Sequence, residues 1–146
     1  MKVKNTSESR RSKCPINAVV EILGDQWSLL ILRDILLKGS ARYSDFHSSD
    51  EGVATNILST RLNHLMGYGL IEKHPDPKDG RAALYVATDR AIDLIPMLIA
   101  AIAWSDKHAP GTRSYDQLLD AYAADPNATT AQVAERARNF RKAHLS

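Results

Sequence analysis

The sequence has little cysteine and no long apolar run, and both shortages narrow its class. Cys14 is the only cysteine among the 146 residues, which excludes an internal disulfide framework and a cysteine-rich zinc site. We therefore expect a reducing, cytoplasmic compartment. The longest apolar stretch, 94–104, is far shorter than the roughly 20 residues of a membrane helix, so we expect no membrane partner. No apolar segment follows the basic N-terminus, and we expect no secretory signal.

Convergent catalytic groups are also missing. The 5 histidines are scattered over different predicted elements. The sequence contains no metal-spaced cluster, nucleophile elbow or phosphate-binding glycine loop. We therefore predict no enzyme activity, no metal and no cofactor.

Charge is nearly balanced overall but unevenly distributed. The net charge is +2, with 44% hydrophobic and 25% charged residues, which is typical of a globular domain and implies no polyanion partner by itself. Residues 1–13, however, hold several lysines and arginines against Glu8 alone, and residues 52–71 contain no acid. We expect 1–13 to form a basic, flexible arm.

Helical spacing dominates residues 14–69. A helix that starts at Cys14-Pro15 has apolar positions at i, i+3, i+4 and i+7, namely Ile16, Val19, Val20 and Leu23. Asp25 can cap the next helix, 26–38, which is apolar on most sides and is the expected core helix. A short helix at 43–49 follows, and then one at 55–68 with Thr55 as its expected N-cap and Gly69 as its left-handed C-terminal residue.

The period then changes to that of strands. Two short segments, "LIEKH" and "ALYVAT", flank "PDPKDGRA", whose prolines and Asp-Gly predict a turn. Three of these helices and the antiparallel hairpin that follows them predict a winged helix-turn-helix, mainly α with a small β-hairpin.

The 55–68 helix has one apolar side and one polar side without acids. Amide and hydroxyl groups of this kind pair with base edges and phosphates in a major groove. The simpler alternative is a solvated helix face, for which more Glu and Lys would be expected. The residues predicted to contact DNA are Thr55, Asn56, Ser59, Thr60, Asn63 and His64.

Three further basic residues have two interpretations each. Arg61 lies at the edge of the apolar side, where it either pairs with a carboxylate, first of all Asp45, or contacts a phosphate. Lys78 and Arg81 bracket the tip of the hairpin, 75–82. This tip is either a wing that reaches phosphates or a minor groove, or a solvated basic turn. The nearby acids Asp76 and Asp79 weaken its electrostatic attraction to DNA.

Two further segments continue beyond the hairpin. A predicted helix at 89–109 is apolar on all sides between Leu94 and Trp104, and Pro96 should bend its start. Burying every side requires a second subunit, the C-terminal extension, or both, and we expect a homodimer. Residues 112–146 contain two potential capping boxes, Ser114-x-x-Gln117 and Thr129-x-x-Gln132. Each would open an amphipathic helix, and we expect these helices to pack against the dimerisation region.

Motifs in residues 14–108 resemble the HxlR family of bacterial transcription regulators, which are similar to MarR-type proteins. They are the Cys-Pro before the first helix, Gly-x-x-Trp-Ser-Leu-Leu-Ile-Leu-Arg at 24–33 and Leu-x-x-Arg-Leu-x-x-Leu at 58–65. The resemblance implies a dimeric winged helix, 14–111, with 55–68 as recognition helix and 89–109 at the dimer interface. The chain departs from the family at Thr88-Asp89-Arg90-Ala91 and in its 112–146 extension.

Cys14 is the candidate for regulatory chemistry. It precedes a proline-started helix, with Lys13 and Arg11 nearby, a setting that favours a thiolate. The resemblance allows a redox or electrophile sensor here, and the alternative is a small residue packed at a helix start. Taken together, the sequence predicts a homodimeric, sequence-specific regulator that binds double-stranded operator DNA. The competing hypothesis is a winged helix that binds protein and not DNA; the small-molecule effector, if any, stays unknown.

Overall fold

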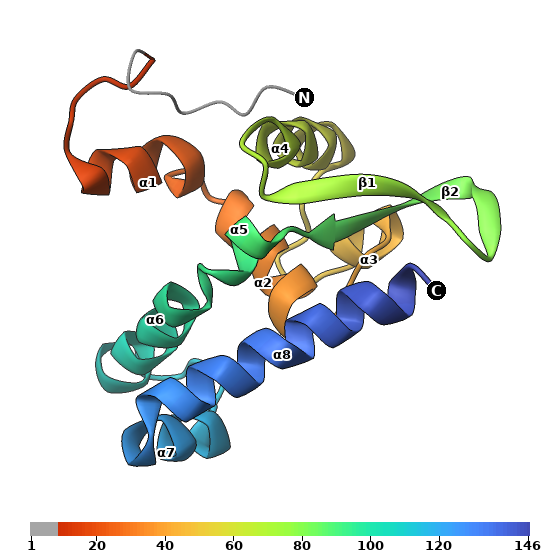
Figure 1. Cartoon of the computed structure of the whole chain (residues 1–146). Coiled ribbons are helices and arrows are strands. Elements are labelled where there is room, and N and C mark those ends of the chain that lie inside the picture. The colour runs from red at the N-terminus through yellow and green to blue at the C-terminus, as the bar shows by residue number, and fades with distance from the viewer. Residues whose placement is uncertain (1–8) are drawn as a thin grey trace.

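A computed structural model describes residues 9–146 (Figure 1). The elements, in order, are α1 (Pro15–Leu23), α2 (Ser28–Leu37), α3 (Tyr43–His47), α4 (Thr55–Gly67), β1 (Ile71–Asp76), β2 (Asp79–Ala87), α5 (Asp89–Ile92), α6 (Ile95–His108), α7 (Asp116–Ala124) and α8 (Pro126–His144). The predicted fold class, mainly helical with one antiparallel hairpin, is confirmed. Most of the predicted arm, residues 1–8, lies outside the described residues.

Helix α2 forms the centre of the core, as its apolar sequence predicts. Leu32 and Leu36 are fully buried, and the helix contacts α1, α4, α8 and β2. Helix α4 contributes Leu58, Leu62 and Leu65 from a single side. Burial of these aliphatic side chains fixes which side of α4 faces the solvent.

The ends of the helices follow local chemistry, with two corrections at N-caps. Gly39 and Gly69 adopt φ angles of +74° and +72°, the left-handed conformation that glycine accommodates at low cost. A carboxylate oxygen of Asp25 accepts the backbone N–H groups of Trp27 and Ser28, both at 2.9 Å, but Trp27 and not Asp25 holds the N-cap position of α2. The predicted cap at Thr55 is wrong, because Ala54 is the N-cap and Thr55 is the first helical residue.

The hairpin is anchored to the helical core near α3. Ile71 pairs with Ala87 at its base and Asp76 with Asp79 at its tip. The backbone N–H of Tyr85 donates to the carbonyl of Ala41 at 2.8 Å, and Arg42 forms an isolated bridge with Leu84. The segment at Ala41 and Arg42 therefore pairs with the free edge of β2. This pairing fixes the direction in which the hairpin leaves the core.

The predicted helix at 89–109 is two helices. Helix α5 ends at Ile92, and α6 begins at Ile95 with Pro96 in its first turn. Proline has no N–H to donate to a preceding turn, so it ends the hydrogen-bond ladder of α5 and does not merely bend it. The hydroxyl of Thr88 donates to the carbonyl of Gly69 at 2.7 Å and links α5 to the end of α4.

Both predicted capping boxes are wrong. Helix α7 begins at Asp116 with Tyr115 as N-cap and no side-chain cap, and α8 begins at Pro126. Asp125 caps α8 by accepting the N–H of Ala128 at 3.1 Å. An Asp followed by a proline starts a helix more readily than Thr129, which is buried inside α8.

Helix α8 lies across the domain below the hairpin (Figure 1). It contacts α2, β2, α5, α6 and α7, so it covers the core of the winged helix and not only the predicted dimerisation region. Phe140 lies against Gly39, and Nε2 of His144 lies 2.7 Å from the carbonyl oxygen of Gly39. Arg141 donates to the carbonyl of Ala87 at 3.0 Å and pairs with Asp89 at 2.9 Å. Helix α8 thus joins the end of α2 to the base of the wing.

Candidate nucleic-acid interface

The outer side of α4 presents a compact polar surface. Thr55, Asn56, Ser59, Thr60 and Asn63 are all exposed, whereas the aliphatic side of the same helix is buried. Helical periodicity alone separates the two sets, since residues three and four apart share a face. Within residues 9–146, the side-chain amides of Asn56 and Asn63 form no hydrogen bond. Both amides are therefore free to pair with an external donor or acceptor.

Helix α3 holds the start of α4 in place. The phenol of Tyr43 donates to the carbonyl of Thr55 at 2.7 Å and lies 3.1 Å from Oγ of Ser59. The hydroxyl of Thr60 donates to the carbonyl of Asn56 at 2.9 Å and can still accept a hydrogen bond from outside. Sequence reasoning missed Tyr43, whose position one residue into a short helix gives no signal for this contact.

His64 differs from the other polar residues of α4. Its Nε2 lies 2.7 Å from the carbonyl oxygen of Ile22, and its ring meets the edge of Tyr68. The side chain is half-buried between α4 and α1. The structure therefore gives His64 a contact with α1, and its contact with DNA stays a prediction.

Arg61 is paired inside the protein, but not with the predicted partner. Its guanidinium lies 3.5 Å from the carboxylate of Asp25, whereas Asp45 accepts the backbone N–H of Arg42 at 3.0 Å. Burial raises the pKa of Asp25, but hydrogen bonds from Ser28 and Trp27 and the charge of Arg61 outweigh it, so this pKa lies below its ordinary value. The sequence spacing could not reveal Asp25 as partner, because the α1–α2 turn and α4 meet only in the folded chain.

The hairpin projects beside α4 (Figure 1), and its sequence places basic residues near the tip. Lys78 and Arg81 are exposed, and their side chains form no ion pair within residues 9–146. Asp76 and Asp79, the two acids near these basic residues, accept hydrogen bonds from the backbone of the turn. Asp76 is buried, pairs with Arg42 and accepts the N–H of Lys78, while Asp79 accepts the N–H of Arg81 at 3.1 Å.

Cys14 is an exposed, free thiol at the N-cap of α1. Of the two cations predicted to favour its thiolate, Arg11 is engaged elsewhere. Its guanidinium donates to Oδ1 of Asn17 at 2.7 Å and lies 3.7 Å from Glu21. Of these two cations, Lys13 alone forms no ion pair with a carboxylate of residues 9–146. The positive charge that favours a thiolate at Cys14 is therefore smaller than the sequence predicts.

Two kinds of feature are absent from residues 9–146. No helix there is long and apolar enough to cross a membrane. No group of three or more His, Cys, Asp or Glu side chains in that range is placed to hold a metal ion.

A short helix, a following helix with an exposed polar side and an adjoining hairpin define a winged helix-turn-helix protein. The family model for the HxlR-like helix-turn-helix matches residues 22–113, which is more than half of the chain. The chain belongs to this family. Its curated relatives carry the names of helix-turn-helix transcriptional regulators and not of enzymes.

Two curated relatives illustrate the similarity. The HTH-type transcriptional regulator sll1512 of Synechocystis, itself uncharacterized, is 36% identical over 87 residues, covering 60% of this chain and 64% of its own. The uncharacterized HTH-type regulator YvaP of Bacillus subtilis is 30% identical over 93 residues, covering 63% of this chain and 85% of its own. The chain spans less than two thirds of the length of sll1512 and 59% of that of the regulator Mb3122 of Mycobacterium bovis.

Solved structures agree on the fold. PA1607, a candidate transcription factor, is 33% identical, with a TM-score of 0.64 over 71% of this chain and 72% of that one. The reduced form of the transcriptional regulator YodB from B. subtilis is 21% identical, with a TM-score of 0.56 over 70% of this chain and all of that one. The second likeness concerns the fold alone.

Proposed function

We propose that the chain binds double-stranded DNA sequence-specifically, with α4 in the major groove. The observation that carries the proposal is the exposed, acid-free face of α4, whose two asparagine amides have no partner inside the described chain. An asparagine amide can form two hydrogen bonds with N6 and N7 of adenine, a pattern that only the major groove presents. Thr55, Ser59 and Thr60 add hydroxyls for phosphates or bases, and His64 is left to its contact with α1.

The wing supplies the second part of the proposed contact. Lys78 and Arg81 extend from the hairpin tip, where they would reach phosphates or a minor groove beside the site of α4. Arg61 takes a structural role through Asp25 and not a phosphate contact. Because the proposed ligand is the bacterial chromosome, the proposed compartment is the cytoplasm.

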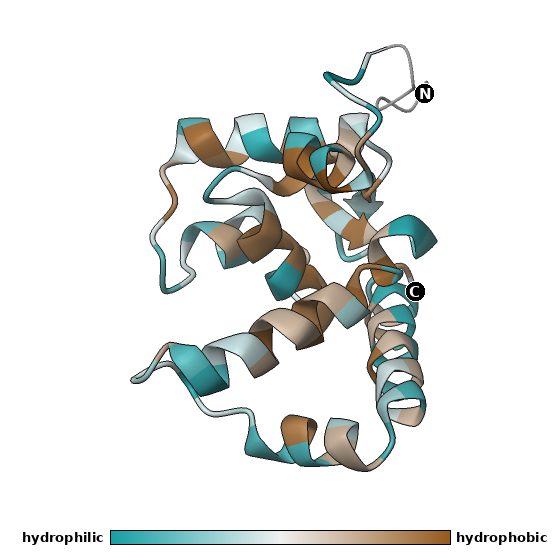
Figure 2. Ribbon diagram, turned by 90° about the vertical axis from the view of Figure 1, so that its left-hand side faces the viewer, coloured by the Kyte–Doolittle hydropathy of each residue, from teal (hydrophilic) through white to brown (hydrophobic). Residues whose placement is uncertain are grey.

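A homodimer is the proposed active form. Within residues 9–146, large apolar side chains are exposed on two helices, α1 and α6: Ile16 of α1 is 73% exposed, Val20 of α1 48% and Trp104 of α6 63%. Figure 2, viewed from this side, shows α6 apolar along most of its length and hydrophilic only at its C-terminal end. A second copy would bury this surface, and a two-fold dimer would read an inverted repeat.

The dimer can be tested by sedimentation of two matched variants. Trp104→Glu should shift full-length protein toward monomers, because it places a charge in the proposed interface. Leu145→Glu, an equally apolar-to-acidic change at an exposed position near the C-terminus, should leave the dimer intact. Dimers in both variants would remove α6 from the interface.

DNA recognition can be tested by selecting bound duplexes from a random pool with full-length protein. The wild type should enrich an inverted repeat. A variant with Asn56→Ala and Asn63→Ala should lose base preference at one or two positions of each half-site. Asn139→Ala, an exposed asparagine of α8, serves as the matched control and should enrich the same motif as the wild type. Failure of the wild type to enrich any sequence would favour the protein-binding alternative.

Cys14 completes the proposal as a candidate sensor. Its thiol is exposed at the start of α1, and α1 carries both the proposed dimer contact and the carbonyl that His64 of α4 meets. Oxidation or alkylation there would act on the element that lies between the dimer surface and the recognition helix. With one cysteine per chain, the products open to it are an intersubunit bridge, a mixed disulfide or an adduct.

A further inference from the structure

A pocket of about 460 Å³ lies between α2 and α6. This volume is within the range of small-molecule sites, about 300–1,000 Å³. The segment that follows α6 closes one side of it with Thr112, Arg113 and Tyr115. The apolar part of the lining comes from α2 and α6, through Leu29, Leu30, Leu37, Leu98, Ala101 and Ile102.

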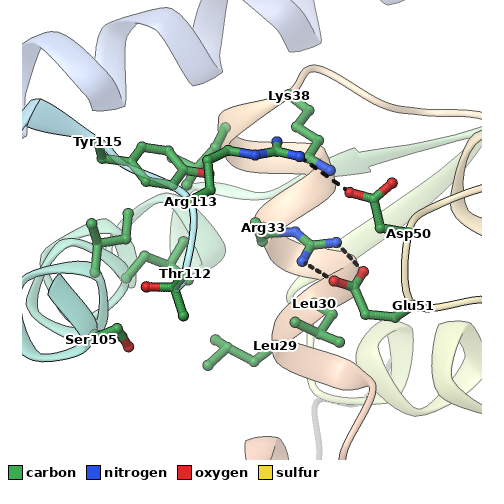
Figure 3. Close-up of a pocket in the computed structure, with 14 residues that line it drawn as sticks. Leu29, Leu30, Arg33, Lys38, Asp50, Glu51, Ser105, Thr112, Arg113 and Tyr115 are labelled. Carbon is green, nitrogen blue, oxygen red and sulfur yellow. Dashed lines mark hydrogen bonds and ion pairs between the residues drawn. The ribbon is translucent and has the colours of Figure 1, made fainter. Parts of the chain in front are cut away.

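The charged lining is concentrated at one end of the pocket (Figure 3). Lys38, Arg113 and Asp50 lie together there, with Arg33 and Glu51 beside them, whereas Leu29 lies at the opposite end. Including Asp34, which contacts Arg33 and Lys38, this end holds three cations and three carboxylates. An anion would therefore enter by exchange with a resident carboxylate and not through net attraction.

The two ion pairs at this end differ in how firmly they are held. Arg33 donates to both oxygens of Glu51, at 2.9 and 2.7 Å, and its hydrogen bonds hold the pKa of Glu51 below its ordinary value. Arg113 makes a single contact of 3.3 Å with Asp50, and the two side chains are 67% and 73% exposed. Exposed pairs with one contact are weak, because solvent screens them and ordering the side chains costs entropy. Arg113 is therefore the cation most easily transferred to another carboxylate.

We propose that this pocket binds an amphipathic organic monocarboxylate. Its apolar body lies between α2 and α6, and its carboxylate replaces Asp50 on Arg113, with Lys38 as a second cation. The released Asp50 is largely exposed and regains water, so the exchange costs little. Burial of the apolar body of the ligand supplies the favourable free energy of binding. The arginine gives selectivity for a carboxylate over a neutral head group.

The pocket also touches the connection that leads into the recognition helix. Asp50 and Glu51 both belong to the segment between α3 and α4, and α4 begins at Thr55. A ligand that takes Arg113 from Asp50 removes one of the two ion pairs that join this segment to other parts of the described chain, while Val53 keeps its place in the core. This part of the inference rests on the proposed DNA binding, and it names the ligand class that would regulate it. The change in DNA affinity should be small, about fivefold at most, because the lost pair is an exposed one.

Calorimetric titration of the full-length protein tests the ligand class without DNA. The probes are octanoate and octanamide, which share an apolar body and differ in head-group charge. The wild type should bind octanoate roughly tenfold more tightly than octanamide, the scale of one charged hydrogen-bonded contact. Arg113→Gln should abolish that difference. The matched control Arg138→Gln removes an exposed arginine of α8 that pairs with Glu135, and it should retain the difference.

Several outcomes would overturn the proposal. They are binding of neither probe, equal affinity for both, or an unchanged preference in Arg113→Gln. Binding that appears only at dilutions where the protein is monomeric would assign the pocket to a second copy of the chain. A protein that binds octanoate but no DNA would retain this site and lose the proposed function, so the two failures are distinguishable.

Discussion

The contact between Gly39 and Phe140 allows a direct test of how α8 docks on the domain. We consider Gly39→Ala and Phe140→Ala, singly and together. A Cβ added to Gly39 would lie 2.9 Å from Cδ1 and 3.0 Å from Cε1 of the Phe140 ring, closer than real Cβ atoms approach. The same residue has a φ of +74°, which an alanine adopts only with strain.

The double variant separates these two effects. Strain at positive φ costs an alanine about 1–2 kcal/mol, and overpacking against the ring adds about 1–3 kcal/mol. Gly39→Ala should therefore lower the free energy of unfolding by about 2–5 kcal/mol. Phe140 is half-buried, so Phe140→Ala should cost about 2 kcal/mol, roughly half of a fully buried phenylalanine. In the double variant the ring is gone, and Gly39→Ala should cost only its backbone strain, about 1–2 kcal/mol.

Urea unfolding followed by circular dichroism gives the four free energies. The predicted signature is a double variant more stable than the sum of the single effects implies, by about 1–3 kcal/mol. Arg138→Ala on the exposed side of α8 should change stability by less than about 0.5 kcal/mol and controls for a general effect on the helix. Additive single effects would refute the reasoning, because they would mean that Phe140 does not cover Gly39.

Four other predictions concern DNA and acid. Asn63→Ala should weaken specific binding by about 1–3 kcal/mol at one base position and non-specific binding less, as competition with unrelated duplex would measure; equal weakening on every sequence would reduce Asn63 to a backbone contact. Arg81→Ala should lower affinity on all sequences and reduce the salt slope by about one phosphate contact, and an unchanged slope would remove the wing from the interface. Cys14→Ser should bind DNA like the wild type but lose any response of binding to oxidant, whereas an oxidant-insensitive wild type would leave Cys14 as a helix-start residue. The folded pKa of Asp25 is depressed, so its ionised form stabilises the fold above the ordinary pKa of 3.8, and this contribution is lost as pH falls through the lower folded value. Acid unfolding curves should therefore show a smaller loss below pH 3.8 for Asp25→Asn, and identical curves would contradict the pairing.

The fold was largely predictable because its strongest signals are periodic. The buried side of α4, the apolar α2 and the glycines at 39 and 69 each follow from spacing or from a backbone requirement. The position of a helix start was less predictable, since several residues near each start could act as cap. Thr55, Ser114 and Thr129 all fit a capping pattern, but Ala54, Tyr115 and Asp125 hold the N-cap positions.

The candidate site was predictable on one element and not across elements. The helical periodicity of α4 identified its exposed amides, because the buried and exposed sides of a helix follow from the 3.6-residue spacing of its own sequence. It could not show that His64 meets the carbonyl of Ile22 or that Arg61 faces Asp25, since both depend on the packing of α1 and the α1–α2 turn against α4. The docking of α8 on β2 was likewise hidden, because an amphipathic stripe does not specify its partner.

The central claim is that α4 reads bases from the major groove, and 7-deazaadenine tests it most directly. This base lacks the N7 acceptor of the major groove but keeps its pairing and its minor-groove edge. Placed singly through a duplex selected by the wild type, it should lower affinity several-fold at one or two adenines of each half-site, and Asn63→Ala should abolish the loss at one of them. Wild-type affinity that is unchanged by 7-deazaadenine at every position would contradict recognition by α4.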